Sequence, residues 1–289
     1  MDTIGSAALV TFLDGVADCV SATNTRIRKD PGFRVSTFLD LAARVAELQF
    51  RNREHLLLFR GQRSDHRNRQ GNTSLKPSLF RPLPTGPRAG AEARWQTALA
   101  ERFARLDRLS QALAERYRAH GLLGVDRISK HRLVRWAILQ HYGICPTPLL
   151  DVTHSLRIAA TFAALDADQE AFVYVLGVPN LSGATTASTE SGVQIIRLAS
   201  ACPPRALRPH IQEGYLLGEY PEIDSLDQNA HYAACDVDFG KRLIGKFCFD
   251  PRTFWTPDFP RISREALYPT PVQDPLSAIA CELAQQENP

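Results

Sequence analysis

Apolar residues recur at helical spacing in several parts of the chain. After Ser36, which suits an N-cap, they return every three or four positions and predict a helix over about 37–51. A second capped helix is expected from Asp126 to about Tyr142, where Gly143 ends it. The same spacing predicts two more helices, over 91–120 and 274–286.

Short apolar runs rich in β-branched and aromatic residues predict strands. One run, 56–59, ends at Arg60-Gly61 and suits a buried strand that delivers an arginine to the end of a sheet. The others lie in the second half of the chain, over 172–176, 193–196 and 245–249. Stretches rich in Gly, Pro and Ser predict an extended loop over 64–90 and a flexible loop over 184–192. Helices that come first and strands that come later predict an α+β fold, with a helical N-terminal part packed on a mixed or antiparallel sheet.

Length and composition set the class of protein. A chain of 289 residues, 44% of them hydrophobic, can bury one large core or two smaller ones. The apolar run 7–20 contains Asp14 and Asp18 and has no basic leader, so it suits neither a signal peptide nor a membrane helix. We therefore expect a cytoplasmic protein with no membrane partner.

The cysteines are spaced singly, without the close pairs of tetrahedral metal sites or redox motifs. We expect reduced, mostly structural thiols and no bound metal. The six positions are Cys19, Cys145, Cys202, Cys235, Cys248 and Cys281.

The net charge of +3 hides an uneven distribution. Arginines are dense between 51 and 135, whereas acidic residues such as Glu213, Asp224 and Asp227 come later. A basic face attracts phosphates, which keeps RNA or DNA among the partners to consider. The more general explanation is a set of solvated helix faces with charge pairs at i,i+4.

Residues 140–163 combine polar, aromatic and turn-forming positions between two apolar helical runs. A purely structural segment would carry a simpler repeat of hydrophobic positions. We therefore expect a site in this stretch.

Three motifs make the chain resemble the FRG domain family, which is named for a Phe-Arg-Gly motif. They are Phe59-Arg60-Gly61-Gln62, Leu75 to Arg81, and Gln140-His141-Tyr142-Gly143 followed by Leu149-Leu150-Asp151. The resemblance covers the chain from Ser36 onward, with 1–35 as an N-terminal extension and a helical insertion at about 91–142. Two positions depart from the family pattern, because Pro148 stands for an arginine and Val152 for a tryptophan.

The chain is also similar, more distantly, to the arginine-serine-glutamate class of ADP-ribosyltransferases. Arg60-Gly61 corresponds to the first motif of that class. Residues 151–155, which lead into Phe162-Ala163, correspond to the second motif. Ile211-Gln212-Glu213 corresponds to the third motif. The resemblance implies an ADP-ribosyltransferase-like sheet and NAD as a substrate. It implies transfer of ADP-ribose to a nucleic acid or protein, as in a bacterial toxin or phage-defence effector that an antitoxin restrains.

The resemblance implies that Arg60 binds the pyrophosphate of NAD, because a guanidinium offers a planar donor fork. Gly61 and Gln62 lie beside Arg60 in the same proposed binding site. An equally good explanation for Arg60 is an ion pair with a buried Asp151. The glycosidic bond to nicotinamide breaks through an oxocarbenium-like state, which an acceptor for a ribose hydroxyl stabilises. The family resemblance favours Gln212 for this role, whereas the chemistry of stabilising the ribose favours Glu213. If the two residues lie on a strand, only one of their side chains faces the site.

The remaining candidates lie in the 140–163 stretch. Thr153 and Ser155 offer hydroxyls for the ribose or the acceptor, although N-capping alone explains Ser155. His141 and Tyr142 offer flat faces and hydrogen bonds for a ring or a phosphate. Asp151 is expected to support the site rather than to react.

The sequence contains fewer motifs that indicate other kinds of enzyme. The chain has no Gly-rich phosphate loop, no His-Glu-x-x-His and no Gly-x-Ser-x-Gly elbow. A nuclease, metal-independent or metal-assisted, is an alternative that would use His66, His141 and Asp151. A third hypothesis is a non-catalytic module that binds a nucleotide or an acidic partner.

Overall fold

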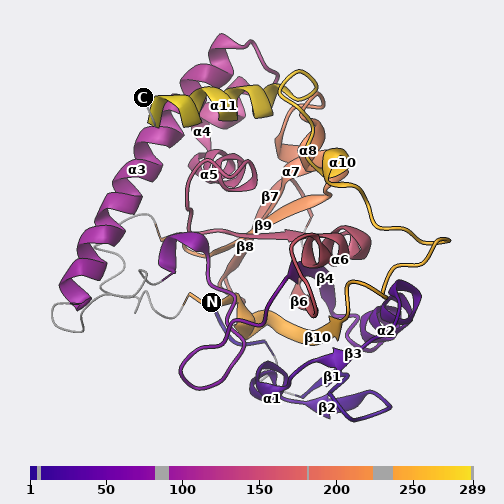
Figure 1. Ribbon diagram of the computed structural model, residues 1–289. Coiled ribbons are helices and arrows are strands. Elements are labelled where there is room, and N and C mark those ends of the chain that lie inside the picture. The colour runs from indigo at the N-terminus through magenta and orange to yellow at the C-terminus, as the bar shows by residue number, and fades with distance from the viewer. Residues whose placement is uncertain (5–7, 82–90, 181, 224–236, 288–289) are drawn as a thin grey trace. The chain divides into compact units, whose positions relative to one another are not determined.

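The computed structural model describes residues 1–4, 8–81, 91–180, 182–223 and 237–287, which form helices and a sheet of mixed strand directions (Figure 1). The predicted α+β class is therefore confirmed. Cys235, Asp224, Asp227 and the last part of the predicted 64–90 loop lie outside the described residues.

The chain folds into two compact units, each assembled from three segments. Unit 1 comprises Met1–Leu75, Val152–Leu181 and Phe239–Leu267. Unit 2 comprises Lys76–Asp151, Ser182–Asp238 and Tyr268–Pro289. Each unit therefore combines parts of the chain that are far apart in sequence.

A mixed sheet forms the centre of unit 1. Its strands follow the order β3 (Phe33–Arg34), β10 (Leu243–Phe249), β6 (Ala171–Pro179) and β4 (His55–Gln62). The β3–β10 pair is parallel and the other two pairs are antiparallel. The last residue of β5 (Leu150–Thr153), Thr153, pairs with Phe59 on β4. Strands β6 and β10 are buried almost throughout, which explains their continuous apolar sequences.

Strand β4 is longer than the apolar run 56–59 predicts. All eight of its residues pair with β6, so the ladder continues through Arg60 and Gly61 to Gln62. The prediction that Arg60 stands at the end of the strand is wrong. Periodicity did not reveal this extension, because the pairing with the buried β6 decides where β4 ends.

Helices cover the sheet of unit 1, and the largest are α2 (Phe38–Arg51) and α6 (Leu156–Leu165). Helix α2 confirms the predicted helix, but Thr37 rather than Ser36 is its N-cap, with its side chain accepting from the backbone N–H of Asp40. The shorter elements of unit 1 are β1 (Leu9–Thr11), β2 (Val20–Ala22), α1 (Asn24–Lys29), η3 (Phe239–Arg242) and α10 (Arg264–Leu267). Residues of the 1–35 segment thus contribute four elements to this unit.

Helices are the most numerous elements among the described residues of unit 2. The long helix α3 (Ala91–Ala119) and the C-terminal α11 (Pro275–Glu287) confirm their predictions. The single helix expected from Asp126 to Tyr142 is wrong, because α4 (Val125–Lys130) ends at His131, where the backbone is extended, and α5 (Arg132–His141) begins there. Gly124, not Asp126, is the N-cap of α4. The short helices are η1 (Ser78–Phe80), α7 (Leu198–Ala201) and α8 (Leu207–Ile211).

Three strands of unit 2 pair in the order β9 (Gly214–Glu219), β8 (Val193–Arg197) and β7 (Thr185–Ser188), all antiparallel. The flexible loop predicted over 184–192 is wrong in part, since Thr185–Ser188 pairs fully with β8. The predicted strands over 172–176, 193–196 and 245–249 are confirmed in β6, β8 and β10.

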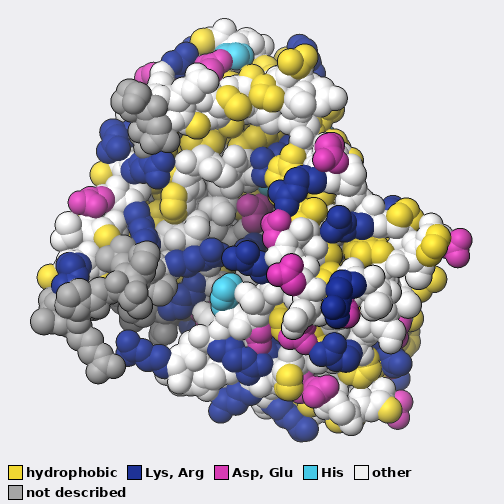
Figure 2. Space-filling view, viewed as in Figure 1, with side chains coloured by type: hydrophobic (Ala, Val, Ile, Leu, Met, Phe, Trp, Pro, Cys, Tyr) yellow, Lys and Arg dark blue, Asp and Glu magenta, His cyan; other side chains and the backbone are white. Residues whose placement is uncertain are grey.

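No helix among the described residues has both the length and the apolar character needed to cross a membrane. Lys and Arg side chains are numerous on the face in Figure 2, and Asp and Glu side chains lie among them. This mixture agrees with solvated faces of both signs more than with a uniform basic surface.

Candidate functional site

Arg60 stands in a row of polar residues that crosses three strands of unit 1. It lies opposite Tyr174 on β6, and Tyr174 lies opposite Lys246 on β10. Residues directly opposite each other in a sheet share a face, so all three side chains lie on the same side. Arg60 is half-buried, whereas Tyr174 and the Lys246 side chain are buried.

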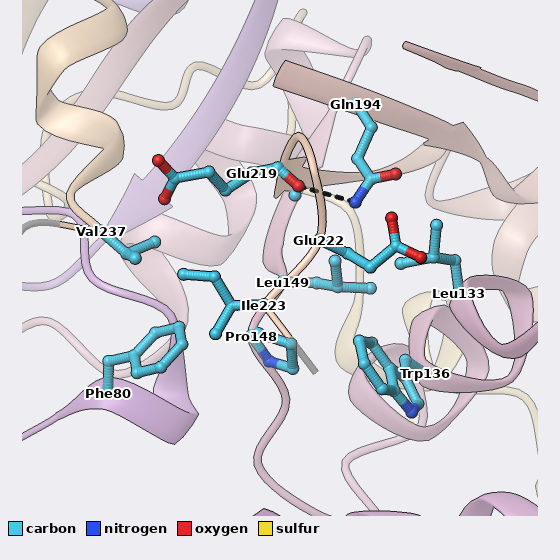
Figure 3. A pocket seen from close by; sticks show the side chains of 11 residues that line it. Phe80, Leu133, Trp136, Pro148, Leu149, Gln194, Glu219, Glu222, Ile223 and Val237 are labelled. Carbon is cyan, nitrogen blue, oxygen red and sulfur yellow. Dashed lines mark hydrogen bonds between the residues drawn. The ribbon is translucent and has the colours of Figure 1, made fainter. Parts of the chain in front are cut away.

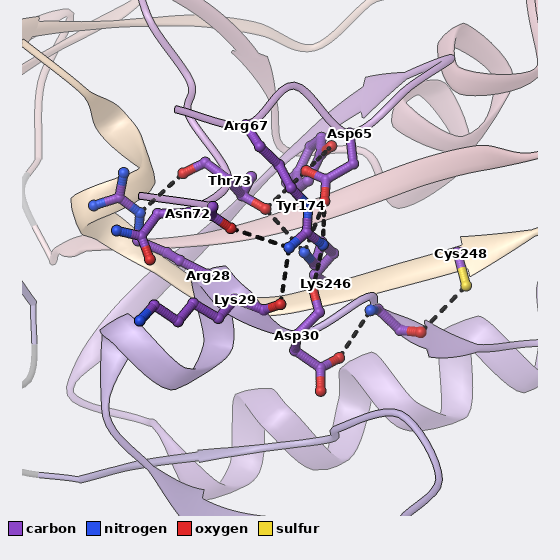
Figure 4. A network of polar contacts seen from close by, with 12 residues as sticks. Arg28, Lys29, Asp30, Asp65, Arg67, Asn72, Thr73, Tyr174, Lys246 and Cys248 are labelled. Atoms are coloured by element: carbon purple, nitrogen blue, oxygen red, sulfur yellow. Dashed lines mark hydrogen bonds and ion pairs between the residues drawn. The ribbon is translucent and has the colours of Figure 1, made fainter. Parts of the chain in front are cut away.

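A single carboxylate, Asp65, joins the buried members of this row to the loop that follows β4 (Figure 4). Its oxygens accept from Lys246 Nζ at 3.0 Å, from Thr73 Oγ1 at 2.7 Å and from Tyr174 OH at 3.2 Å. Arg67 also pairs with it at 2.8 Å and donates to backbone carbonyls of Lys29 and Asp30. The network therefore fixes the loop to the sheet.

Burial controls the ionisation of the buried members of this row. It lowers the pKa of Lys246, an effect that the nearby Asp65 opposes. It raises the pKa of Tyr174, and Asp65 adds to that rise because a second negative charge beside a carboxylate is unfavourable. The raised pKa keeps the Tyr174 hydroxyl protonated at neutral pH, as its hydrogen bond to Asp65 requires.

A second row lies beside the first on the same face. Gln62 is opposite Phe172, whose ring stacks on that of Tyr174 with the centroids 6.3 Å apart. The Oε1 atom of Gln62 is buried and has no hydrogen-bond partner among the described residues. A buried acceptor without a donor is costly, by about 1–3 kcal/mol, so this atom is suited to receive a donor from a ligand or water.

The opposite face of β4 is covered by α6. A Cβ on Gly61 would stand 1.9 Å from the carbonyl oxygen of Ala159 and 2.6 Å from the nitrogen of Ala163, so only glycine permits this approach. Thr153 pairs with Phe59 and shares this face, which means that it points away from the Arg60 row. Its buried hydroxyl accepts from the N–H of Ser155 at 3.0 Å. Ser155 is the N-cap of α6 by position, but its side chain makes no capping hydrogen bond.

In unit 2, His141 and Asp151 form a close pair. Nδ1 of His141 lies 3.1 Å from Oδ1 of Asp151, and the exposed fractions of the two side chains are 3% and 30%. A Cβ on Gly214 would stand 2.9 Å from Cε1 of the imidazole, so this glycine lets the start of β9 pack against the ring. The other ring nitrogen, Nε2, is buried without a hydrogen-bond partner in the described part of the chain.

Tyr142, next to His141, is anchored in the core of unit 2. Its hydroxyl donates to Oδ2 of Asp274 at 2.9 Å, and the same oxygen accepts from the N–H of Arg208. Burial and the neighbouring Asp274 raise the pKa of Tyr142. The Arg208 guanidinium lies 5.2 Å from the centre of the Tyr142 ring. Packing and hydrogen bonding within unit 2 are therefore sufficient to explain why a tyrosine occupies position 142.

Gln212 and Glu213 do not lie on a strand, so the expectation that they face opposite sides of one is wrong. Gln212 is the C-cap of α8 and is 4% exposed. Glu213 follows it with a φ of 44°, and its side chain is exposed. A left-handed residue after a helix is a common way to end it, and glycine usually fills this position.

A small pocket in unit 2 encloses about 210 Å³ of empty space, open solvent included (Figure 3). Trp136, Leu149 and Pro148 line it, and Glu222 at its edge pairs with Arg132 at 3.1 Å. The departure from the family pattern at Pro148 therefore lies in the wall of this pocket. None of the predicted site residues lines it.

The family model for the FRG domain matches residues 55–171. The chain contains an FRG domain. No curated protein matches the chain, and no solved structure matches it.

The FRG domain begins with β4 and ends at the first residue of β6. It includes the Arg60 to Gln62 segment and Thr153 in unit 1, together with the His141–Asp151 pair in unit 2. Gln212 and Glu213 lie beyond it. Because Arg60 and Asp151 belong to different units, the ion pair considered between them stays a prediction, and so does the shared NAD site.

Sequence reasoning missed the network around Asp65. One signal for it was present, since Lys246 interrupts the apolar sequence Leu-Ile-Gly-Lys-Phe-Cys-Phe of a buried strand. A charge in such a run requires a partner, but only the fold identifies that partner as Asp65. Among the described residues, no group of three or more His, Cys, Asp or Glu side chains is placed to hold a metal ion.

Proposed function

We propose that this protein is an NAD-dependent ADP-ribosyltransferase that modifies a macromolecule, either a nucleic acid or a protein. The observation that carries the proposal is the surroundings of β4. The Arg60-Gly61 strand pairs with the strand that ends at Thr153, and that strand leads directly into α6, which packs on Gly61. The resemblance to ADP-ribosyltransferases rests on this same order of elements.

The charge of the Arg60 row supports binding of the NAD pyrophosphate. Arg60, Arg67 and Lys246 bring three positive charges to the row and its covering loop, and Asp65 brings one negative charge. Excess positive charge attracts an anion, and an arginine binds phosphate through two parallel hydrogen bonds. Hydrogen bonds to charged groups stabilise by about 1.5–3 kcal/mol each. The half-buried Arg60 is the residue proposed to hold the pyrophosphate.

Gln62 supports the same assignment. It lies two positions along β4 from Arg60, on the same face, and its Oε1 atom is the buried acceptor without a partner among the described residues. The carboxamide of nicotinamide carries N–H donors that such an oxygen can accept. Gln62 is therefore proposed to orient the nicotinamide end of NAD.

The reaction exchanges one bond at the ribose for another. The bond between C1′ and the nicotinamide nitrogen breaks, neutral nicotinamide leaves, and C1′ bonds to a nucleophilic atom of the acceptor, which loses a proton. Positive charge develops on the ribose in between, and a group that accepts from a ribose hydroxyl stabilises it. Gln212 and Glu213 are the groups proposed for this role.

The test is incubation of the purified protein with NAD labelled in its adenylate phosphate and with a cell lysate. We expect free nicotinamide and a labelled macromolecule, and digestion with nuclease or protease then identifies the acceptor. Arg60→Ala should lower kcat/KM for NAD by about 10- to 100-fold, which corresponds to the loss of a charged hydrogen bond. The exposed Arg69 of the same unit provides the control, because Arg69→Ala should leave kcat/KM unchanged.

The same assay separates the alternatives. A folded protein that releases no nicotinamide and transfers no label would overturn the proposal. Cleavage of RNA or DNA without NAD would favour a nuclease, and a rise in melting temperature with NAD but without turnover would favour a binding module. Growth arrest on expression of the wild type, but not of Arg60→Ala, would support a toxin or antiviral effector and the search for an antitoxin.

A further inference from the structure

The half-buried Arg208, on helix α8 of unit 2, lies over two tyrosine rings. Its guanidinium carbon is 5.2 Å from the centre of the Tyr142 ring and 4.7 Å from the centre of the Tyr268 ring. Contacts with aromatic faces fix the plane of a guanidinium and leave its edge for hydrogen bonds. The backbone of Arg208 is anchored as well, because its N–H donates to Oδ2 of Asp274 at 2.9 Å. The side chain is therefore oriented before any ligand binds.

The charge of Arg208 has no counter-ion in the described part of the chain. Its side chain makes no ion pair and donates no hydrogen bond to a described residue. Nε is the nitrogen that is buried without an acceptor, so the terminal nitrogens Nη1 and Nη2 are the ones that reach solvent. Asp274 anchors the backbone only, since its oxygens accept from the Tyr142 hydroxyl and from the N–H groups of Arg208, Leu276 and Ser277. A half-buried cation in this state is suited to receive an anion.

Other half-buried arginines of unit 2 find their acceptors within the protein. Arg102 and Arg135 donate to backbone carbonyls, and Arg132 pairs with Glu222 at 3.1 Å. For Arg208 the acceptors must come from solvent or from a ligand. This difference separates it from the arginines that only hold the unit together.

The surroundings of Arg208 indicate the kind of anion. The segment 197–212, just before Glu213, contains three arginines and no Asp or Glu. One of them, Arg205, is exposed and has no ion pair among the described residues. Three residues of chain place its backbone at most about 11 Å from that of Arg208. Two arginines this close suit a doubly charged anion more than a carboxylate, and a phosphate monoester carries about −1.5 to −2 charges at neutral pH.

Apolar side chains adjoin the guanidinium. Leu207 precedes Arg208, and Ile211 follows it by about one turn of α8; they are 37% and 38% exposed. Tyr268, whose ring lies against the guanidinium, is 36% exposed. Apolar surface that stays in water beside a cation suits a ligand that carries an apolar group next to its charge. An organic phosphate meets both requirements.

We infer that Arg208 is the phosphate-binding residue of a site for an organic phosphate monoester. Nη1 and Nη2 donate two parallel hydrogen bonds to two phosphate oxygens, and Arg205 adds a second positive charge. The organic group of the ligand lies against Leu207 and Ile211. The residues of the site all belong to unit 2, and the inference does not depend on the proposed transfer of ADP-ribose.

The test is a titration of the full chain, followed by the NMR signals of the arginine Nε–H groups at constant ionic strength. The Arg208 signal is the one that Arg208→Lys removes. Inorganic phosphate should shift it with a Kd of about 1–10 mM, and phenyl phosphate or AMP should bind at least about threefold more tightly. Sodium acetate at the same concentration should shift it less. The tighter of phenyl phosphate and AMP then shows whether an aromatic phosphate or a nucleotide is the better ligand.

The variants are compared by the rise in melting temperature with inorganic phosphate. Arg208→Met keeps a long side chain against the rings and removes the charge, so phosphate affinity should fall by at least about 10-fold. Arg208→Lys keeps the charge without the planar fork and should lose about 3- to 10-fold. The exposed Arg118 on α3 of the same unit is the matched control. Arg118→Met removes one positive charge elsewhere and should keep the wild-type affinity.

The wild type alone can overturn the inference, even if a variant fails to fold. An Arg208 signal that no phosphate shifts would exclude this site, and equal affinity for acetate and phosphate would exclude the phosphate class. Equal phosphate affinity in the wild type and Arg208→Met would overturn the role of Arg208. AMP and phenyl phosphate that bind no more tightly than inorganic phosphate would overturn the role of Leu207 and Ile211.

Discussion

At the scale of single residues, Gly61 is part of the Arg60-Gly61 motif, and it also determines how closely α6 packs on β4. It follows Arg60 in the strand and lets the backbone of α6 approach β4 directly. Glu213 is a contrasting case, because an ordinary residue occupies a backbone conformation that glycine adopts more easily. Both positions give predictions that depend on local geometry alone.

Gly61→Ala should lower the free energy of unfolding by about 3 kcal/mol or more, because the added carbon meets backbone atoms that cannot move aside. The contacts would be 1.9 Å to the oxygen of Ala159 and 2.6 Å to the nitrogen of Ala163. Guanidinium unfolding measures the change. Gly71 has a φ of 76° and nothing within 4 Å, so Gly71→Ala should cost only about 1 kcal/mol. Equal costs for the two variants would contradict this account.

Glu213→Gly should raise the free energy of unfolding by about 0.5–1 kcal/mol. The left-handed conformation at a φ of 44° costs a residue with a side chain about 1–2 kcal/mol, which exceeds the extra chain entropy of glycine, about 0.5–1 kcal/mol. Thermal and chemical unfolding measure the difference. Glu213→Ala retains the strain and should give no gain, so a gain of the same size in both variants would argue against relief of strain.

At the scale of elements, the loop after β4 is joined to the sheet by a network that includes one buried ion pair. The side chains of Lys246 and Asp65 are 1% and 8% exposed and lie 3.0 Å apart. Removing one partner of such a pair leaves a buried charge, which is far more costly than the pair itself is stabilising. We therefore expect a large coupling energy between substitutions of Asp65, in the 64–75 loop, and Lys246, on β10.

Asp65→Ala should cost about 3–5 kcal/mol of unfolding free energy in the wild-type background. In a Lys246→Met background the same change should cost about 1–3 kcal/mol less, since no lysine is then left unpaired. A double-mutant cycle by urea unfolding measures this coupling.

The exposed pair Arg44 and Asp40 on α2, with side chains 35% and 34% exposed, is the control for that cycle. Its coupling energy should stay below about 0.5 kcal/mol, because solvent screens both charges. Simple additivity for Asp65 and Lys246 would show that the pair does not act as a unit.

At the scale of the whole molecule, burial of tyrosines links stability to pH. Burial raises the pKa of Tyr117 to about 12, and it raises the pKa of Tyr142 and Tyr174 as well. In the unfolded chain these phenols ionise near their ordinary pKa of about 10. Above that pH the unfolded state binds fewer protons than the folded state, so stability falls as pH rises.

Between about pH 9 and about pH 11 the free energy of unfolding should therefore decrease steadily. Guanidinium unfolding at several pH values measures the slope, and ultraviolet absorbance counts the phenolates. Tyr117, Tyr142 and Tyr174 should ionise only when the protein unfolds. Tyr117→Phe removes one contributor and should make the decrease smaller. Ionisation of all tyrosines in the folded protein near pH 10 would contradict the prediction.

Several helices and strands could be predicted from the sequence, because their hydrophobic pattern matches the burial of their residues in the structure. The apolar stripe of α2, the length of α3 and the β-branched run of β8 are of this kind. The Arg60-Gly61 motif and the 140–151 stretch also located the FRG domain. Local pattern is sufficient there, because periodicity and backbone preference specify an element whose buried face is continuous.

Other features depended on contacts between distant segments. The extension of β4 through Arg60 comes from pairing with β6, and the orientation of Thr153 away from Arg60 comes from the register with Phe59. The partner of Lys246 is 181 positions away in sequence, and the packing of His141 requires Gly214. By itself, the sequence determined the fold class and the positions of the polar motifs. Only the tertiary structure decided which faces those motifs share, because strand register and burial are set by long-range packing.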